Sequence, residues 1–291
     1  MQHNNQYYPS YLRLEQLLDC QHPLSFEKGQ EPAHDEMLFI IIHQAYELWF
    51  KQLLFELEYV KKVFNKDHVD DNSEDLNLCR HRLGRMVRIM ELLNQQVAVL
   101  DTMTPLDFLE FRNLLTPASG FQSKQFRLLE ASLGLKMEKR HQKDYYKRTN
   151  EGGFTEPDYK EINTEESVES LLQQINRWLE RMPFFDDKYW QGYQPEAKEK
   201  VANHPFWDDY RTIYKNSLTH NEENQLKAFD EHFLSGQTYE DSLSPAARRS
   251  ALFIMLYRDF PVFQTSFQIL DKLIELDHLF AGWRHKHYVM V

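Results

Sequence analysis

The chain has 291 residues, 42% of them hydrophobic, which is enough for one large domain or two small ones with a substantial core. Lys and Arg total 34 against 45 Asp and Glu, and the net charge of −11 disfavours binding to nucleic acids and to anionic membranes. Two cysteines, Cys20 and Cys79, are too few for a disulfide framework or a cysteine zinc site. Without a signal-peptide pattern or an apolar run long enough to span a bilayer, the sequence predicts a soluble cytoplasmic protein.

Scarce glycine, abundant Leu, Glu, Lys, Gln and Arg, and few strand-like runs predict an all-α fold. The predicted helices cover about residues 11–20, 36–64, 76–100, 105–115, 123–133, 165–181, 195–233, 246–258 and 262 onward. Asp35 is expected to cap the helix 36–64, and Thr104 the helix that begins at Pro105. The long helices 36–64 and 76–100 share a short link, which predicts a bundle of long antiparallel helices.

Two segments stand apart from this helical pattern. Residues to about 20 form an N-terminal arm, and the charged, tyrosine-rich residues 137–163 are predicted to be a surface excursion. We find no internal repeat, and the expectation is a single all-α domain over residues 1–291.

The last predicted helix contains two histidines, His285 and His287. The apolar positions that precede His287 in steps of four, three, four and three are Trp283, Phe280, Leu276 and Leu273. This is the period of one helical face, so His287 points inward, whereas His285, two residues away, points outward. An inward histidine is either a core residue with its hydrogen bonds satisfied or a ligand to a bound group.

A second histidine, His43, lies in the apolar stretch 38–50, one helical turn after Phe39. Burial in such a segment should keep the imidazole neutral, and a neutral imidazole can bind a metal, form hydrogen bonds or act as a base. The alternative is a structural histidine that is bonded to Glu47 one turn on.

Arg112 shares an apolar helix face with Phe108 and Leu115. A guanidinium in this position needs an anionic partner because its charge cannot be removed by titration. That partner is either an internal carboxylate in a salt bridge or the carboxylate of a ligand.

Two inward histidines are too few for most metal sites built from protein ligands alone. They suffice for a haem, because the porphyrin supplies four nitrogens and the protein needs to supply only one axial ligand. The other histidine could then lie on the open side of the iron.

Four segments of this chain, in the same order, resemble the tryptophan 2,3-dioxygenase family. They are Tyr11-Leu12-x-Leu14, the run from His34-Asp35-Glu36 through His43-Gln44 to Trp49, the run from Phe111-Arg112 through Pro117 to Arg127, and Trp283-Arg284-x-x-His287 followed by Met290-Val291. The resemblance implies a haem b enzyme that is a homotetramer, arranged as a dimer of dimers. It implies insertion of both atoms of O2 across the indole 2,3-bond of L-tryptophan to give N-formylkynurenine, the first step of the kynurenine pathway.

The resemblance also implies roles for particular residues. His287 matches the axial ligand of the iron, and His43 matches a distal catalytic histidine that contacts the indole N–H. Arg112 matches the residue that binds the substrate carboxylate, and Ser119 matches a small polar residue above the haem. The positions implied to contact the substrate are Phe39, Ile40, Ile41, Ile42, His43, Phe108, Arg112, Ser119 and, from the segment that completes the neighbouring subunit's pocket, Tyr8, Tyr11 and Leu12.

Family members continue after this last helix into a glycine-rich loop that closes over the substrate. This chain stops at Val291, so a C-terminal lid segment is expected to be missing from the sequence or from the protein. If the lid is lost, the alternative is a helical protein that binds haem or tryptophan without catalysis. A purely structural helical bundle is a third hypothesis.

Overall fold

The computed structural model describes residues 7–70, 73–135, 153–181, 188, 190–202, 204–235 and 242–290. Within these ranges all regular secondary structure is helical, which confirms the predicted all-α fold. No helix in the described ranges has the length and apolar character needed to cross a bilayer.

The α-helices are α1 (Tyr8–Leu12), α2 (Leu14–Leu17), α3 (Asp35–Phe64), α4 (Glu74–Leu100), α5 (Pro105–Leu115), α6 (Lys124–Leu133), α7 (Glu156–Ser167), α8 (Leu171–Glu180), α9 (Pro205–Ser217), α10 (Glu223–Phe229), α11 (Pro245–Leu256) and α12 (Gln264–Met290). Short 3-10 turns η1 (Leu24–Phe26), η2 (Gly120–Gln122), η8 (His220–Glu222) and η10 (Pro261–Phe263) connect several of them, and η9 (Asp230–Leu234) is a π-helical turn.

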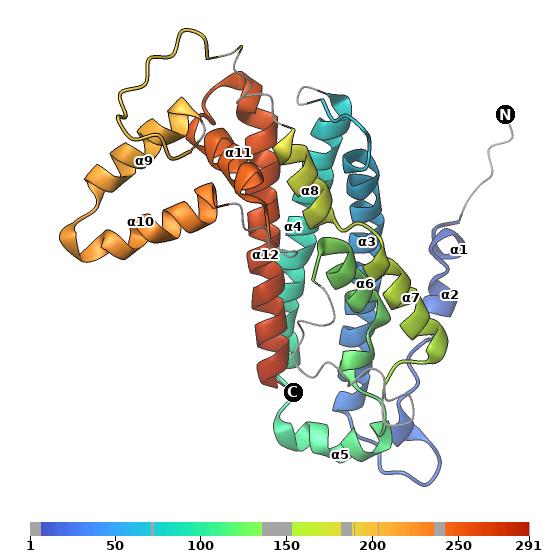
Figure 1. Cartoon of the computed structure of the whole chain (residues 1–291). Coiled ribbons are helices and arrows are strands. Elements are labelled where there is room, and N and C mark those ends of the chain that lie inside the picture. Colours follow the sequence, from blue (N-terminus) through green and yellow to red (C-terminus); the bar gives the residue numbers. More distant parts are fainter. Residues whose placement is uncertain are drawn as a thin grey trace, which may run out of the picture.

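Helices α3, α4 and α12 lie side by side and form the body of the molecule (Figure 1). The buried Glu56 of α3 accepts hydrogen bonds from Arg82 and Arg85 of α4, at 3.1 and 2.6 Å. Lys66, just after the end of α3, forms an ion pair with Asp75 in the first turn of α4. The two helices therefore run antiparallel, as predicted.

Helix α12 runs parallel to α4. The Arg80 guanidinium donates to the Gln268 side chain at 2.9 Å. Several turns further along both helices, the Asn94 amide donates to the Leu279 carbonyl at 3.0 Å. The two contacts advance in the same direction along both helices, so the ends that carry residues 94 and 279 are on the same side. A continuous apolar core fills the space between the long helices, with α6, α8 and α11 packed against it.

The predicted stop and start signals are partly confirmed. Thr104 caps α5 as expected, because its hydroxyl accepts from the Asp107 N–H while the Asp107 carboxylate accepts from the Thr104 N–H at 2.7 Å. The predicted cap of α3 is wrong: the helix already includes Asp35, and the N-cap position is His34, which makes no side-chain cap. The predicted helix 11–20 is also wrong, because a left-handed Arg13, with φ of 51°, divides it into α1 and α2.

The region from residue 153 to residue 181 differs from its prediction. Residues 137–152 of the expected surface excursion lie outside the described residues, but from residue 156 the chain forms α7, whose Ile162 is fully buried. The predicted helix 165–181 is two helices, because Val168 is extended and Ser170 forms a capping box with Gln173 that starts α8.

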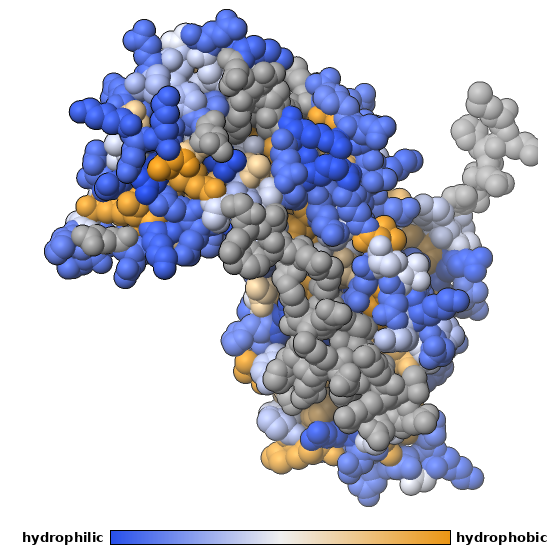
Figure 2. Space-filling model, viewed as in Figure 1, coloured by the Kyte–Doolittle hydropathy of each residue, from blue (hydrophilic) through white to orange (hydrophobic). Residues whose placement is uncertain are grey.

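The predicted helix 195–233 begins only at Pro205. Two buried carboxylates hold the preceding segment in a non-helical path: Asp209 accepts from the N–H groups of residues 196 and 197, and Asp208 from those of residues 201 and 202. After α9 ends, the chain continues through η8, α10 and η9 rather than as one helix. Most of the molecular surface seen in Figure 2 is hydrophilic, consistent with the composition.

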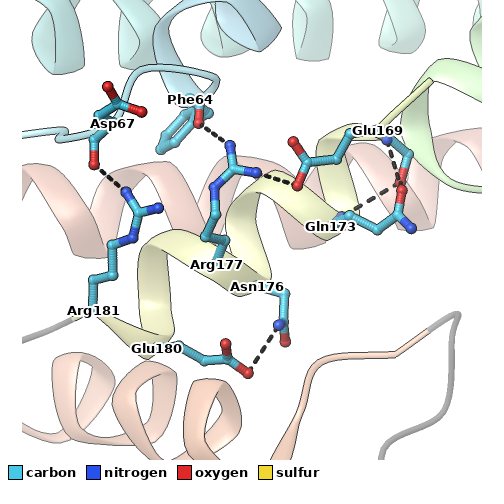
Figure 3. A network of polar contacts seen from close by, with 9 residues as sticks. Phe64, Asp67, Glu169, Gln173, Asn176, Arg177, Glu180 and Arg181 are labelled. Atoms are coloured by element: carbon cyan, nitrogen blue, oxygen red, sulfur yellow. Dashed lines mark hydrogen bonds and ion pairs between the residues drawn. The ribbon is translucent and has the colours of Figure 1, made fainter.

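Helix α8 is fixed to the end of α3 by arginine side chains (Figure 3). Arg177 donates to the Phe64 carbonyl at 3.0 Å and pairs with Glu169, while Arg181 donates to the Asp67 carbonyl. These bonds satisfy carbonyls at the C-terminal end of α3 that have no partner within the helix.

The Glu56→Gln variant should be less stable by about 1–2 kcal/mol, because charge-assisted hydrogen bonds to Arg82 and Arg85 become neutral ones at a buried position. The free energy of unfolding in urea measures this effect. Glu58→Gln, an exposed change on the same helix, is the control and should leave that free energy unchanged. Equal stability of the two variants would contradict the assignment.

Candidate active site

The two histidines singled out by the sequence face each other near one end of the bundle. His43 comes from α3 and His287 from the last turns of α12, and their ring centroids are 6.4 Å apart with an interplanar angle of 73°. His287 is half-buried and His285 is exposed, as the helical period predicts. The packing of α3 and α12 against α4 therefore brings together residues that are far apart in the sequence.

The His43 ring is fixed by its own helix. Its Nδ1 lies 2.7 Å from the Phe39 carbonyl oxygen, and because a carbonyl can only accept, Nδ1 carries the proton and donates it. Nε2 then carries the lone pair. The alternative in which His43 bonds Glu47 is wrong, because the single N–H of the neutral ring donates to the Phe39 carbonyl; the Glu47 carboxylate instead accepts from the Gln125 amide of α6 at 2.8 Å.

Both imidazoles are neutral near pH 7. Burial is the main cause of the lowered pKa of His43, which its bond to the Phe39 carbonyl and the charge of Glu47 partly offset. Burial, followed by the nearby His43 and the positive charge of Arg127, lowers the pKa of His287 to about 4. Each ring therefore offers an unprotonated nitrogen under ordinary conditions.

Three aromatic rings form a wall beside His43. Phe39 lies 4.1 Å from the His43 ring and stacks on Phe108 of α5, with 5.8 Å between centroids. Phe111, which is fully buried, meets both rings edge-on at 5.6 and 5.4 Å. The sequence indicated Phe39 and Phe108 but missed Phe111, whose position three residues after Phe108 places it on a neighbouring part of the same helix face.

Arg112 lies at the edge of this wall. Its guanidinium is 5.9 Å from the centre of the Phe108 ring, and the residue is exposed. It makes no ion pair with any residue that the structure describes. Of the two alternatives for its partner, the internal salt bridge is therefore not found among these residues. A cation next to an aromatic wall is thus available to an anionic ligand.

The segment that contains Ser119 approaches His287. The Ser119 hydroxyl accepts from the Phe121 N–H, and the Gln122 side chain accepts from the Ser119 N–H at 2.8 Å, which together close the turn η2. A Cβ placed on Gly120 would lie 3.5 Å from Cε1 and 3.9 Å from Nε2 of His287. The Gly120 backbone therefore lies beside the edge of the imidazole, at a separation where a Cβ would make an ordinary van der Waals contact.

Two further aromatic residues hold the histidines in place. The Trp283 ring is nearly parallel to the His287 ring, at 5.1 Å and 15°, and Tyr46 meets both His43 and Trp283 edge-on. Both are buried. The helical period already places Trp283 on the face of His287, and the same rule would have found Tyr46, three residues after His43.

The three consecutive isoleucines do not share one surface. Successive helical residues are rotated by about 100°, and Ile42 is buried in the core whereas Ile41 is 48% exposed. Ile40, partly buried, is the one that lies closest to the face of His43. Ile41 and Ile42 thus point away from the face of His43 within this chain, and their implied substrate contacts stay predictions.

Tyr8, Tyr11 and Leu12 are not brought to the histidines within this chain. They lie on α1 with exposed fractions of 67%, 69% and 40%. Helix α1 lies beside the bundle, away from the end where α5 and the C-terminal end of α12 lie (Figure 1).

The donor set fits a haem better than a metal bound by side chains alone. Among the described residues no group of three or more His, Cys, Asp and Glu side chains could hold a metal ion. Two neutral histidines with aromatic neighbours nevertheless lie next to each other, and one imidazole is enough for a cofactor that brings its own equatorial nitrogens.

The fold and the site define a helical protein with a facing pair of neutral histidines, an aromatic wall and a cation at its edge. Comparison of sequences assigns it more closely. The family profile of tryptophan 2,3-dioxygenase matches residues 1–291. The chain belongs to the tryptophan 2,3-dioxygenase family, a family of haem-containing oxidoreductases.

Individual relatives agree with this assignment. The chain is 41% identical to the tryptophan 2,3-dioxygenase of Bdellovibrio bacteriovorus, over 98% of this chain and 81% of that protein. It is 41% identical to the enzyme of the same name from Dictyostelium discoideum, over 98% of this chain and 73% of that protein. It is 40% identical to tryptophan 2,3-dioxygenase B of Danio rerio, over 98% of this chain and 72% of that protein.

The free energy of unfolding of the cofactor-free protein should fall as the pH is lowered from 6.5 to about 4, because unfolded His287 binds a proton at pH values where the folded residue does not. Above 6.5 the contribution is fully present, and below about 4 it is lost. Urea unfolding across this range measures the slope. His287→Gln should reduce it and the exposed control His285→Gln should not; equal slopes for all three proteins would refute the assignment.

Proposed function

We propose that this protein catalyses the dioxygenation of L-tryptophan by O2 to N-formylkynurenine. Both oxygen atoms enter the product and the indole C2–C3 bond is broken, so no other oxidant is required. The observation that carries the proposal is the facing pair of neutral His43 and His287 beside an aromatic wall, in a chain of this family. This supports catalysis over the alternative of a haem- or tryptophan-binding protein without turnover, and over a purely structural bundle.

The aromatic wall and Arg112 provide a binding site for the two ends of tryptophan. The rings of Phe39 and Phe108 suit the flat, apolar indole, and Ile40 lies beside them. The unpaired guanidinium of Arg112 can hold the α-carboxylate in a bidentate pair, with Ser119 as a further polar contact. Holding both ends of the substrate fixes the orientation of the indole ring, and such positioning lowers the barrier to reaction.

His43 is proposed to orient the indole rather than to act as a strong base. Its Nδ1 proton is committed to the Phe39 carbonyl, so Nε2 is free to accept the indole N–H. Indole N–H is a very weak acid, and a neutral imidazole with a lowered pKa is a weak base. A hydrogen bond in the ground state is therefore a better match to the chemistry than proton removal.

His287 is proposed as the axial ligand of haem b. Its low pKa keeps the imidazole unprotonated, and the stacked Trp283 ring fixes its plane. When bound, haem iron supplies the activation of O2.

We further infer a cytoplasmic homotetramer, a dimer of dimers, in which each chain is one domain. Tyr8, Tyr11 and Leu12 support this inference, because three exposed apolar side chains on one short helix are suited to cover a site on a neighbouring subunit. The net charge of −11 gives no support for nucleic acid as a partner.

The direct test is turnover. Purified protein supplied with haem and reductant should consume O2 and L-tryptophan in equal amounts and form a product that absorbs in the near ultraviolet. A haem spectrum that responds to tryptophan without any product would refute catalysis and favour the binding protein. Failure to bind haem at all would favour the structural bundle.

His287→Ala should abolish stable haem binding and turnover while the helical circular dichroism spectrum is retained, because no other described residue replaces the imidazole at that position. Added imidazole should restore part of the haem absorption. His285→Ala, a change of the same kind two residues away on the exposed face, is the control. Wild-type haem content in His287→Ala without imidazole would exclude His287 as the ligand.

Arg112→Ala should lower kcat/KM for L-tryptophan, because the bound carboxylate is left without its partner. The loss should correspond to about 2–4 kcal/mol of transition-state stabilisation. Haem content should not change, since Arg112 is exposed. Arg112→Lys keeps the charge but not the bidentate geometry and should fall between the two. Parallel loss of haem and activity would show instead that Arg112 is structural.

A further inference from the structure

Glu36, in the first turn of α3, is a carboxylate that the proposed chemistry does not use. It is only 1% exposed and forms no ion pair with a described residue. Instead its two oxygens accept the backbone N–H groups of Leu24 and Ser25, both at 2.8 Å. A buried charge is costly unless it is well bonded, so this carboxylate fixes the turn η1 firmly to α3.

The same segment is tied down at two other points. The Ser25 hydroxyl accepts from the Ala33 N–H at 3.0 Å, which closes the loop that leads back to α3. Gln44 of α3 donates to the Cys20 carbonyl at 2.8 Å and accepts from Gln21 at 2.6 Å. Glu36 and Gln44 thus attach residues 20–25 to α3 on either side of Phe39 and His43.

The fixed turn η1 packs against α5, the helix that carries Phe108 and Arg112. Helix α5 also contacts α3 directly. In Figure 1, α5 crosses the end of the bundle, with the loop from α2 to α3 next to it. The separation of α5 from α3 therefore depends on how η1 is held.

We propose that Glu36 is a positioning residue for the substrate pocket: by fixing η1, it sets the place of α5 and so the distance from Arg112 to His43. The inference rests on the proposed function for its effect on tryptophan. It concerns neither the cofactor nor the reacting atoms.

The sharpest test removes one N–H and little else. Leu24→Pro deletes the donor to Glu36 Oε1, and proline suits the first position of a 3-10 turn that follows an extended residue. Leu24→Ala loses the same half-exposed side chain but keeps the N–H, and is the matched control. Glu36→Gln tests the same bonds from the other side, with the exposed Glu31→Gln as its control.

The first measurement is binding of L-tryptophan and of tryptamine, which lacks the carboxylate, to the haem-loaded protein. Leu24→Pro and Glu36→Gln should bind L-tryptophan roughly tenfold more weakly than their controls, because a small displacement of Arg112 weakens a geometry-dependent pair. Tryptamine binding should change less than twofold. Equal weakening for both ligands, or none for either, would overturn the inference.

The second measurement does not depend on the ligand. Spin labels on Leu48→Cys of α3 and Leu109→Cys of α5, both exposed positions, report the distance between the two helices in a Cys20→Ser background. Cys79 is buried, and burial raises the pKa of its thiol to about 12, so it should not react with the label. The distance distribution should broaden or shift in Leu24→Pro and not in Leu24→Ala.

The two measurements separate the inference from the proposed function. If the unaltered protein does not prefer L-tryptophan to tryptamine, the proposed role of Arg112 fails, while the spin-label distance still tests the position of α5. If the preference is present but the distance is the same in Leu24→Pro and Leu24→Ala, the positioning role of Glu36 is wrong and the proposed function stands.

Discussion

The register of α3 and α12 on their common neighbour α4 is the constraint on which the site depends. Glu56 bonded to two arginines sets α3 on α4, and Asn94 bonded to the Leu279 carbonyl sets α12 on α4. A slip by one helical turn at either interface moves a side chain by about 5.4 Å. That is close to the whole 6.4 Å between the rings of His43 and His287, so no such slip is compatible with a facing pair.

Polar and apolar functions are separated in space. The imidazoles are half-buried among aromatic rings, and this burial keeps them uncharged, while the guanidinium of Arg112 lies at the exposed edge. This division matches a ligand with an apolar body and a charged end. In an acidic chain, this cation makes no ion pair with a described residue, and an internal partner would compete with the ligand's carboxylate.

The sequence predicted those parts of the structure that local periodicity decides. The steps from Leu273 to His287 determine which histidine points inward, and Thr104 with Asp107 determines where α5 starts. Local periodicity could not decide between Phe39 and Glu47 as the partner of His43. Gln125, whose amide donates to the Glu47 carboxylate, lies 78 residues further along the chain. Only the packing of α6 on α3 brings it next to Glu47.

Helix ends that depend on tertiary contacts were also missed. Residues 195–204 have a helical composition, but Asp208 and Asp209 take up their backbone N–H groups from a later helix. The break between α7 and α8 depends on a capping box at Ser170, a signal that is visible in the sequence once Gln173 is considered with it. The motifs of the family indicated His43 and His287, and the packing of the helices brings these two residues together.

The bond from His43 Nδ1 to the Phe39 carbonyl separates two properties of the site, the tautomer of His43 and the shape of the aromatic wall. The acceptor is a main-chain atom, present whatever amino acid occupies position 39, and the helix holds it in place. Which nitrogen of His43 carries the proton is therefore independent of the side chain at position 39, whereas the shape of the aromatic wall depends on it directly. Substitutions at this position can reshape the pocket for a different ring without disturbing the tautomer of the histidine beside it.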